Sequence, residues 1–350
     1  MLNEIRKDYL LDRWVVIATH RGRRPTDFIK TEEVSPIESQ SSCPFCPGNE
    51  RKTPPAELVY LKSKNGIVKD RDVNGSRHKD WLIRTVPNLF SAFSPPENGD
   101  NFESGRAVGH HEVLVESPNH NEHPAVARKA QLIHVINGYI DRLLALSMKP
   151  YTKYVSIFRN HGLVAGASLS HAHSQIIATP MIPTIPRLEL NASEKYYDSH
   201  GTCVFCDTIA EESGGPRFIW ENEAFAVFAP WASVHPFEFW MIPKAHEASL
   251  QGMRLPTIKK FAEALKVCLG GLKSLLNDPP YNYGFHISPS KEIMEFYHWH
   301  LEVYPRLTLW AGFEKSTGTY INVMKPEQAA HDLKDIITQK SGKNQEHISA

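Results

Sequence analysis

The sequence lacks an excess of charge, a long hydrophobic run and a targeting segment. Its 39 Lys and Arg residues balance 39 Asp and Glu residues, which argues against a nucleic-acid or anionic membrane surface as the main binding partner. No apolar run approaches the length that crosses a bilayer, and the N-terminus has no signal-peptide pattern. We therefore expect a cytoplasmic protein that binds neither nucleic acid nor membrane.

Cysteine is also scarce, with only five residues in a chain of 350. Four of the five form two Cys-x-x-Cys pairs, Cys43 with Cys46 and Cys203 with Cys206. In a reducing compartment such pairs indicate metal ligands before disulfides. A pair of redox-active dithiols is the weaker interpretation, because neither pair opens a thioredoxin-like βαβ pattern. Histidine, by contrast, is abundant at 18 residues, so metal and acid–base sites are expected.

One segment, residues 170–175, carries two histidines, His171 and His173, and continues into the apolar run Ile176–Ala178. On a strand, residues two apart point to the same face. Two imidazoles that face one way suggest a metal site, a transferred group, or both. The motif alone leaves open a third interpretation, a polar strand end whose histidines only form hydrogen bonds.

The chain shows the same order of features twice. Each half has a Cys-x-x-Cys turn, a strand that closes with proline and histidine, a long amphipathic helix, another strand and a His-x-His segment. The helices are predicted from Ala125 to about Met148 and from Leu255 to Leu276. This repetition predicts an internal duplication, with halves at residues 1–195 and 196–350. Strands are predicted at Glu112–Glu116, Tyr154–Phe158, Phe225–Ala229, Glu238–Ile242, Asn282–Ile287 and Trp299–Tyr304.

The repeated cysteine pairs and histidines predict two zinc sites. Zinc favours four tetrahedral ligands, and a Cys-x-x-Cys turn supplies two of them. The predicted ligands are Cys43, Cys46, His120 and His171 in site 1, and Cys203, Cys206, His246 and His298 in site 2.

If His171 is a metal ligand, His173 is left free on the same strand face to attack an electrophile. Ser174 and Gln175 can donate hydrogen bonds to phosphate oxygens, and the small residues 166–168 allow a close approach. These residues favour attack on phosphorus, stabilised by fixed hydrogen-bond donors.

Several motifs together resemble the galactose-1-phosphate uridylyltransferase family, a branch of the histidine-triad superfamily. The resemblance covers nearly the whole chain and implies an α+β fold of two histidine-triad-like halves, each an antiparallel sheet packed with helices. The motifs are Arg21-Gly-Arg-Arg24-Pro, Cys43-x-x-Cys46, Ser117-Pro-Asn-His120, Asn160-x-Gly162, His171-x-His173-x-Gln175, Gly284-Phe-His286, His298-x-His300 and Gly312-Phe-Glu314.

This resemblance implies a nucleotidyltransferase of galactose or other carbohydrate metabolism. His173 would form a covalent nucleotidyl-imidazole in a ping-pong exchange between a sugar nucleotide and a hexose 1-phosphate or phosphate. Gln175 would hold the α-phosphate. The remaining implied nucleotide or phosphate contacts are Arg21, Arg24, Asn88, Phe90, Asn160, Gly162, Ser168 and Ser174. A homodimer is plausible for this family, although the duplication could already supply the pairing of two halves.

Some residues depart from the uridylyltransferase pattern. The family usually has His-Pro-His-Gly-Gln, whereas this chain has His-Ala-His-Ser-Gln, and Leu89 replaces an acidic residue near the base. The C-terminal segment Gly318–Asn322 lacks the usual hexose-binding glutamine. These features, and the second Cys-x-x-Cys pair, are similar to the plant-type branch, which acts as an ADP-glucose phosphorylase. The choice between uridine and adenosine therefore stays open.

The second metal site and the enzymatic role each have an alternative. Glu189, His286, His298 and His300 match a different metal site of the uridylyltransferases. Both candidate sets need His298, so we expect only one to be filled, and we favour the set with the thiolates. A zinc-stapled protein that binds nucleotides without turnover is the alternative to an enzyme.

Overall fold

The computed structural model describes residues 3–19, 40–73, 75–97, 105–289 and 294–346. The larger of its two sheets has eleven strands within these residues, in the order β4-β3-β5-β6-β8-β7-β12-β13-β11-β10-β9, and all neighbours are antiparallel. The strands are β3 (Leu58–Ser63), β4 (Gly66–Asp70), β5 (Trp81–Pro87), β6 (His110–Val115), β7 (Tyr154–His161), β8 (His173–Thr179), β9 (Phe218–Glu221), β10 (Phe225–Phe228), β11 (Phe239–Pro243), β12 (Tyr281–His286) and β13 (His300–Pro305).

The strand order confirms the predicted duplication. Inward of the edge strand β4 it runs β3-β5-β6-β8-β7, and from the opposite edge β9-β10-β11-β13-β12, so the two halves repeat one arrangement and meet in the middle. There β7 pairs with β12, with Tyr281 opposite His161 and Gly284 opposite Phe158. The two halves therefore share one continuous sheet, where the sequence predicted a sheet in each.

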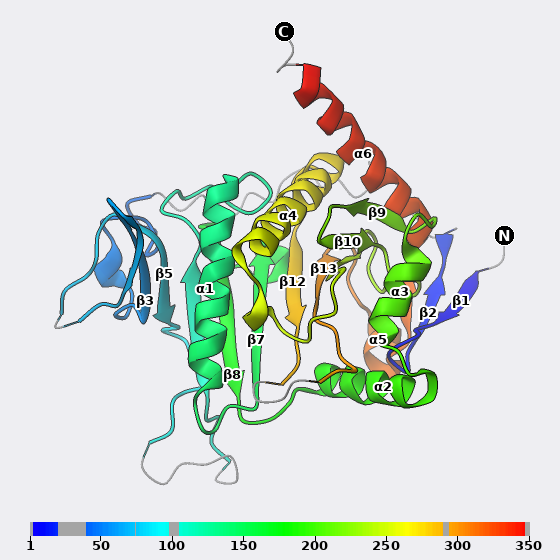
Figure 1. Ribbon diagram of the computed structural model, residues 1–350, viewed down its shortest axis with the longest axis horizontal. Coiled ribbons are helices and arrows are strands. Elements are labelled where there is room, and N and C mark those ends of the chain that lie inside the picture. The colour runs from blue at the N-terminus through cyan, green and yellow to red at the C-terminus, as the bar shows by residue number, and fades with distance from the viewer. Residues whose placement is uncertain (1–2, 20–39, 74, 98–104, 290–293, 347–350) are drawn as a thin grey trace.

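Two long helices cover one face of this sheet, α1 (Lys129–Ser147) and α4 (Leu255–Leu276) (Figure 1). Their apolar stripes recur at helical spacing and are buried, for example at Leu132 and Leu143 of α1 and at Phe261 of α4. Each such side chain contributes on the order of 2 kcal/mol through burial. Gly138 lets α1 approach the sheet, because a Cβ there would lie 2.6 Å from Cδ1 of Ile83.

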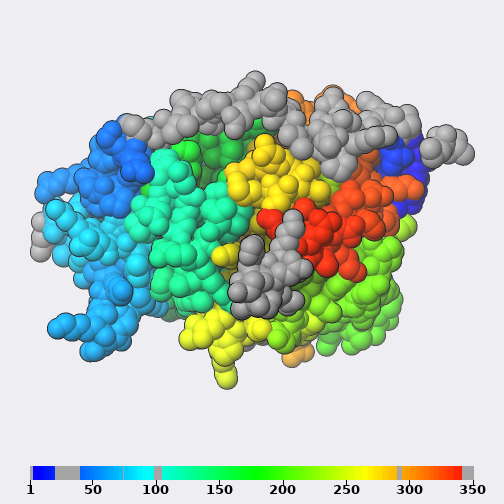
Figure 2. All heavy atoms as spheres, turned by 90° about the horizontal axis from the view of Figure 1, so that it is seen from above, coloured from blue at the N-terminus to red at the C-terminus, as the bar shows by residue number. Residues whose placement is uncertain are grey.

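The N-terminal strands lie with the second half of the chain. Strands β1 (Glu4–Lys7) and β2 (Trp14–Ile17) form a three-stranded sheet with β14 (Tyr320–Asn322). Figure 2 shows the blue N-terminal residues against orange and red C-terminal ones. Arg6 also pairs with Glu327 at 2.9 Å, at the start of α6 (Pro326–Glu346).

The predicted boundary at residue 195 falls inside helix α2 (Thr184–His200). This helix packs with α3 (Val204–Glu212) on the second half, where Leu190 joins the same apolar cluster as Phe205. The remaining short elements are α5 (Gly312–Thr317), η3 (Glu50–Lys52), η5 (Leu163–Ala165) and η6 (Leu250–Gly252). Within the described part of the chain, none of the helices combines the length and the apolar character that a bilayer span requires.

Candidate active site

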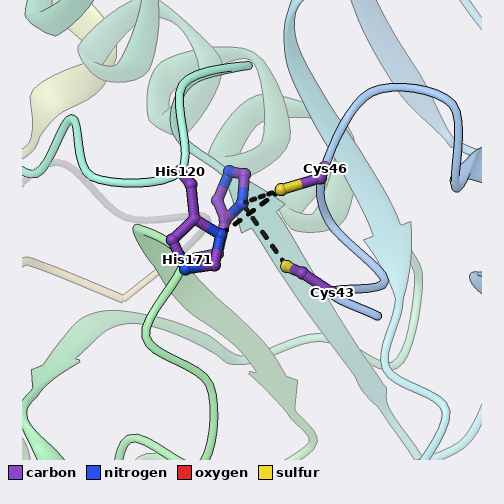
Figure 3. A group of neighbouring side chains, drawn as sticks. All are labelled: Cys43, Cys46, His120 and His171. Atoms are coloured by element: carbon purple, nitrogen blue, oxygen red, sulfur yellow. Dashed lines mark hydrogen bonds between the residues drawn. The ribbon is translucent and has the colours of Figure 1, made fainter. Parts of the chain in front are cut away.

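The four residues predicted for site 1 meet in one buried cluster (Figure 3). Nδ1 of His171 lies 3.5 Å from the Sγ atoms of both Cys43 and Cys46, and Nδ1 of His120 lies 3.3 Å from Sγ of Cys46. All four ligand atoms lie within 4.8 Å of one another. Two thiols and two imidazoles at this spacing are a donor set typical of structural zinc.

The outer nitrogens of both imidazoles in site 1 are already engaged. Nε2–H of His171 donates to the carbonyl oxygen of Ser117 at 2.8 Å, and Nε2 of His120 lies 2.9 Å from Oγ of Ser170. Because a carbonyl only accepts, the proton of neutral His171 is on Nε2 and the lone pair of Nδ1 faces the thiols. Burial lowers the pKa of His171 to about 4, so the ring is neutral near pH 7.

His173 begins β8 and is held by the backbone of site 1. Its Nδ1–H donates to the carbonyl oxygen of His171 at 2.8 Å, which places the lone pair of the neutral ring on Nε2. Burial lowers the pKa of His173, and the charge of Arg159 adds to this effect. No described residue forms a hydrogen bond with Nε2, so the lone pair of this nitrogen is available as a nucleophile.

A buried ion pair supports the strand behind His173. The guanidinium of Arg159 donates to Glu116 at 2.7 Å and to the carbonyl oxygen of His173 at 3.0 Å. Both charged side chains are only 2% exposed. Breaking such a pair leaves an uncompensated buried charge, so this contact fixes the position of the His173 backbone.

Gln175 lies two residues after His173 and faces the same side of β8. Its Oε1 accepts a hydrogen bond from Nε2–H of His111 at 2.7 Å, because Nδ1 of His111 already accepts from the amide of Ala92. The side-chain NH2 of Gln175 is thereby oriented to donate to an oxyanion. Sequence reasoning missed His111 and the Arg159–Glu116 pair, whose roles depend on contacts between strands.

A cavity of about 560 Å³ adjoins site 1 and is lined by three of the predicted phosphate-binding residues, Asn160, Gly162 and Ser168. Oδ1 of Asn160 accepts from the amide of Asn282 at 2.8 Å, which leaves the Asn160 NH2 to donate elsewhere. Gly162 has φ +81°, and a Cβ there would lie 2.9 Å from Cβ of Pro280. Only glycine fits this position between the two halves.

Asn88 and Phe90 lie at the end of β5, beside the His111–Gln175 contact. The side-chain amide of Asn88 adjoins the His111 ring, and its Oδ1 accepts from the amide of Phe90 at 2.9 Å. The Phe90 side chain is 86% exposed and free to stack on a flat ligand. The other predicted phosphate contacts, Arg21 and Arg24, lie outside the described residues.

Ser174 does not fit its predicted contact with phosphate. It lies between His173 and Gln175 on β8, so its side chain points to the opposite face of the sheet. There its hydroxyl is fully buried and bonds to Glu116 and, at 2.6 Å, to the hydroxyl of Tyr139. Tyr139 in turn lies 2.9 Å from the hydroxyl of Tyr283, so Ser174 belongs to a polar network under α1 that joins the two halves.

The four residues predicted for site 2 also meet. Nδ1 of His246 and Nδ1 of His298 lie 3.4 and 3.6 Å from Sγ of Cys206. A hydrogen bond from Cys206 lowers the pKa of Cys203, and His298 contributes in the same direction. His246 is exposed, so site 2 is more open than site 1.

The alternative second site does not compete for His298, contrary to our expectation. His298 faces the cysteines, and the other cluster is completed by Glu302. His300 and Glu302 share one face of β13 by strand alternation, whereas His298 lies before this strand begins. This cluster consists of Glu189, His286, His300 and Glu302.

The chain matches a family model described as galactose-1-phosphate uridyl transferase, N-terminal domain, over residues 1–183. It is 33% identical over 344 residues to the ADP-glucose phosphorylase of Arabidopsis thaliana, an alignment that covers 95% of this chain and 93% of that protein. The chain belongs to the galactose-1-phosphate uridyl transferase family. The predicted family and the predicted enzyme class, a nucleotidyltransferase, are thereby confirmed.

One further relative and one solved structure extend this result. The galactose-1-phosphate uridylyltransferase of Thermotoga maritima is 28% identical over 344 residues, covering 95% of this chain and 98% of that one. The crystal structure of the Arabidopsis thaliana ADP-glucose phosphorylase with bound ADP-glucose superimposes with a TM-score of 0.78 at 30% identity, covering 95% and 99% of the two chains. The histidine-triad-like α+β fold is therefore shared with the transferase family over nearly its full length.

Proposed function

We propose that this protein transfers a nucleoside monophosphate between a sugar nucleotide and a phosphate-bearing acceptor through a covalent intermediate on His173. The observation that carries the proposal is the hydrogen bond from Nδ1–H of His173 to the carbonyl oxygen of His171, which leaves Nε2 unprotonated. A neutral, oriented imidazole held by His171, which lines the cavity, is suited to attack on phosphorus. Membership in the transferase family supports the same chemistry.

The exchange takes two steps. Nε2 of His173 attacks the α-phosphorus of the donor, the bond from phosphorus to the bridging oxygen breaks, and the hexose 1-phosphate leaves with that oxygen and its electrons. An oxygen of the acceptor phosphate then attacks the same phosphorus and breaks the N–P bond, which returns the electron pair to Nε2. The amide NH2 groups of Gln175 and Asn160 would donate to the non-bridging oxygens as their charge increases.

The base and the acceptor define two forms of this proposal. We favour ADP-glucose as donor and phosphate as acceptor, because Leu89 replaces an acidic residue near the base and site 2 has a cysteine pair, as in the plant-type branch. The ADP-glucose phosphorylase of Arabidopsis thaliana supports this form. UDP-glucose with galactose 1-phosphate is the second form, supported by the uridylyltransferase of Thermotoga maritima.

The donor sets of sites 1 and 2 fit zinc, and we propose one ion in each. Bound there, zinc would act as a structural cross-link rather than as a reactant. In site 1 the ligand His171 also supplies the carbonyl that orients His173. We expect the enzyme to act in the cytoplasm, and a homodimer remains a prediction of the family resemblance.

The test is intact mass spectrometry of the protein after incubation with ADP-glucose or with UDP-glucose. We expect a mass gain of one nucleotidyl group, larger in occupancy with ADP-glucose and lost in His173→Ala. His200→Ala is the matched control, because His200 is an exposed histidine at the end of α2. Absence of an adduct with either donor, while both still bind, would favour the non-catalytic nucleotide-binding protein.

A product assay then separates the two forms. Each donor is paired with phosphate and with galactose 1-phosphate, and the products are separated by ion-exchange chromatography. Formation of ADP from ADP-glucose and phosphate supports the favoured form. Turnover only with UDP-glucose and galactose 1-phosphate would overturn the proposed base and acceptor while leaving the nucleotidyl-histidine step intact.

A further inference from the structure

A second cluster of potential metal ligands lies on the wall of the 560 Å³ cavity, and the proposed reaction does not use it. It consists of His123, His161 at the end of β7, and Asp278 just after α4. Nε2 of His161 lies 3.1 Å from Oδ1 of Asp278, and Nε2 of His123 lies 3.8 Å from Oδ2 of the same carboxylate. The three ligand atoms lie within 4.8 Å of one another.

The cluster is held by both halves of the molecule. His161 stacks on Tyr281 of β12, with ring centroids 4.7 Å apart. Asp278 has φ +59° and its amide donates to the carbonyl oxygen of Lys273 at 2.9 Å, which ends α4. The two imidazoles and the carboxylate are therefore fixed on opposite sides of the junction between β7 and β12.

The two imidazoles are suited to bind a cation through their lone pairs. Burial lowers the pKa of His123 to about 3, with the neighbouring His161 adding to the effect, and burial also lowers the pKa of His161. Both rings are therefore neutral near pH 7. The proton that Nε2 of His161 donates to Asp278 would move to Nδ1 when Nε2 binds a metal ion. Nδ1 of His123 is buried and has no hydrogen-bond partner among the described residues.

The spacing of the cluster agrees with the size of a small metal ion. Ligand atoms bonded at about 2.0–2.2 Å in a tetrahedral arrangement lie about 3.4 Å apart. The distance of 3.1 Å from Nε2 of His161 to Oδ1 of Asp278 is close to this value. An anion is disfavoured in the same place, because Asp278 would repel it and the two neutral imidazoles would not attract it.

We propose that His123, His161 and Asp278 form a third metal site, which takes a divalent transition-metal ion such as Zn²⁺. Two imidazoles and one carboxylate leave coordination positions open, unlike the closed sets of two thiols and two imidazoles. The open positions face the cavity that Asn160 and Ser168 also line. The site opens into the same cavity as the proposed phosphate contacts, but this proposal does not depend on the nucleotidyl-transfer chemistry.

The charge of Lys273 affects the affinity that we expect this site to have for Zn²⁺. Its ammonium lies 2.8 Å from Oδ2 of Asp278, so it orients the carboxylate and leaves Oδ1 for the metal. Its positive charge opposes the cation, and the site lacks thiolates. Zinc should therefore bind here more weakly than in sites 1 and 2, and its affinity should increase when the charge of Lys273 is removed.

The test is equilibrium dialysis of the full chain against buffered free Zn²⁺, with the bound zinc counted by elemental analysis. We expect two tightly held zinc ions and a third that binds at higher free zinc. His161→Phe, which keeps the stacking on Tyr281, and Asp278→Asn, which keeps a residue that tolerates positive φ, should each weaken only the third ion by at least about tenfold. His200→Ala should leave all three unchanged.

Lys273→Met gives a test that loss of folding cannot imitate, because the third ion should bind several-fold more tightly in this variant. Retention of the two tight zinc ions in every variant shows that the fold is intact. The proposal is overturned if no third zinc binds. It is also overturned if the affinity for the third ion is the same in the wild type, His161→Phe, Asp278→Asn and Lys273→Met.

Discussion

The two halves of the molecule carry the same His-x-His segment, but they leave its second histidine in different states. Nδ1–H of His173 donates to the carbonyl oxygen of His171, and Nδ1–H of His300 donates to that of His298 at 3.3 Å. In the second half, Nε2 of His300 also lies 3.2 Å from the carboxylate of Glu302. The carboxylate of Glu302 therefore engages Nε2 of His300, the nitrogen that has no such partner in His173.

The residue two positions later accounts for this difference. Gln175 has an amide whose oxygen is occupied by His111, whereas Glu302 presents a carboxylate to the ring before it. The His300 ring is fully buried, with ring centroids 4.7 Å from Phe205 and 5.0 Å from Trp240. The backbone hydrogen bond alone therefore does not make a nucleophile, because the other nitrogen must also be free and accessible.

The largest expected difference in kcat is between a substitution of His173 and a substitution of His300. His173→Ala should lower kcat by at least about 10⁴-fold, because it removes the attacking nitrogen. His300→Asn should change kcat by less than about tenfold once the folded fraction is matched by circular dichroism. Steady-state kinetics with ADP-glucose and phosphate measure both values. Equal losses of kcat in the two variants would show that the two histidines do not differ in their role in catalysis.

Gln175→Glu gives the first half the residue that the second half carries. The carboxylate can still accept from His111 but cannot donate to phosphate, and it repels the negative charge of the substrate. We expect kcat to fall by roughly 10²–10³-fold with a small change in melting temperature. The isosteric variant Glu302→Gln in the second half is the control and should retain near wild-type kcat. Full activity of Gln175→Glu would exclude the amide as an oxyanion donor.

Sites 1 and 2 should differ in their influence on kcat. Cys43→Ser weakens the site whose ligand His171 orients His173, so kcat should fall by about 10–100-fold among the molecules that remain folded. Cys203→Ser removes the corresponding thiol of site 2 and should lower the melting temperature with less effect on kcat. Kinetics and zinc content are measured on the same samples. A larger kcat loss in Cys203→Ser would contradict this ranking.

The charged network of the second half should make stability depend on pH. His286 lies 2.8 Å from Glu189 and 3.6 Å from Glu302. Although burial opposes the charge, these carboxylates raise the pKa of His286 from 6.5 to about 9. Its contribution to the free energy of unfolding is therefore complete below pH 6.5 and lost as the pH rises to 9, a change of roughly 2–3 kcal/mol.

Urea unfolding at pH 6.5, 7.5 and 9 measures this slope. His286→Asn should be less stable at pH 6.5 and should lose less stability on going to pH 9 than the wild type. Burial also raises the pKa of Glu238 to about 8, so the free energy of unfolding falls with rising pH in both the wild type and His286→Asn. The contribution of His286 is therefore the difference between the two slopes. Identical slopes would mean that His286 is not charged in the folded protein.

The smallest expected effect on activity belongs to Ser174→Ala. The serine hydroxyl bonds to Glu116 and Tyr139 on the face away from the cavity, so kcat and KM should stay within about threefold. Loss of these buried hydrogen bonds should lower the free energy of unfolding by about 1–3 kcal/mol. A large increase in the KM of the acceptor in Ser174→Ala would instead support the predicted contact of Ser174 with phosphate.

Features that depend on local pattern could be predicted from the sequence. Helix α4 has the predicted bounds, and α1 begins four residues later than predicted because Arg128 is still extended. Both groups of two cysteines and two histidines could be matched because each half repeats the same order of ligands. The position of Ser174 was also accessible, because the alternation that places His173 and Gln175 together places Ser174 opposite.

Features that depend on contacts across the sheet could not be predicted. His111 contacts Gln175 only because β6 pairs with β8 in one particular register. Glu302 reaches His286 only because β12 and β13 are neighbours, although its place beside His300 follows from alternation along the predicted strand. Strand β2 likewise pairs with β14, near the other end of the chain, a contact that no local pattern indicates.

The pairing of β2 with β14 has a consequence for synthesis on the ribosome. Ile17 is made early, but its partner on β14, Asn322, follows roughly 300 residues later. At about 5–20 residues per second, the first strands must wait about 15–60 s before their sheet can form. The first half can pack α1 on its strands during this interval, whereas the second half is completed only when the oldest and the newest segments of the chain meet.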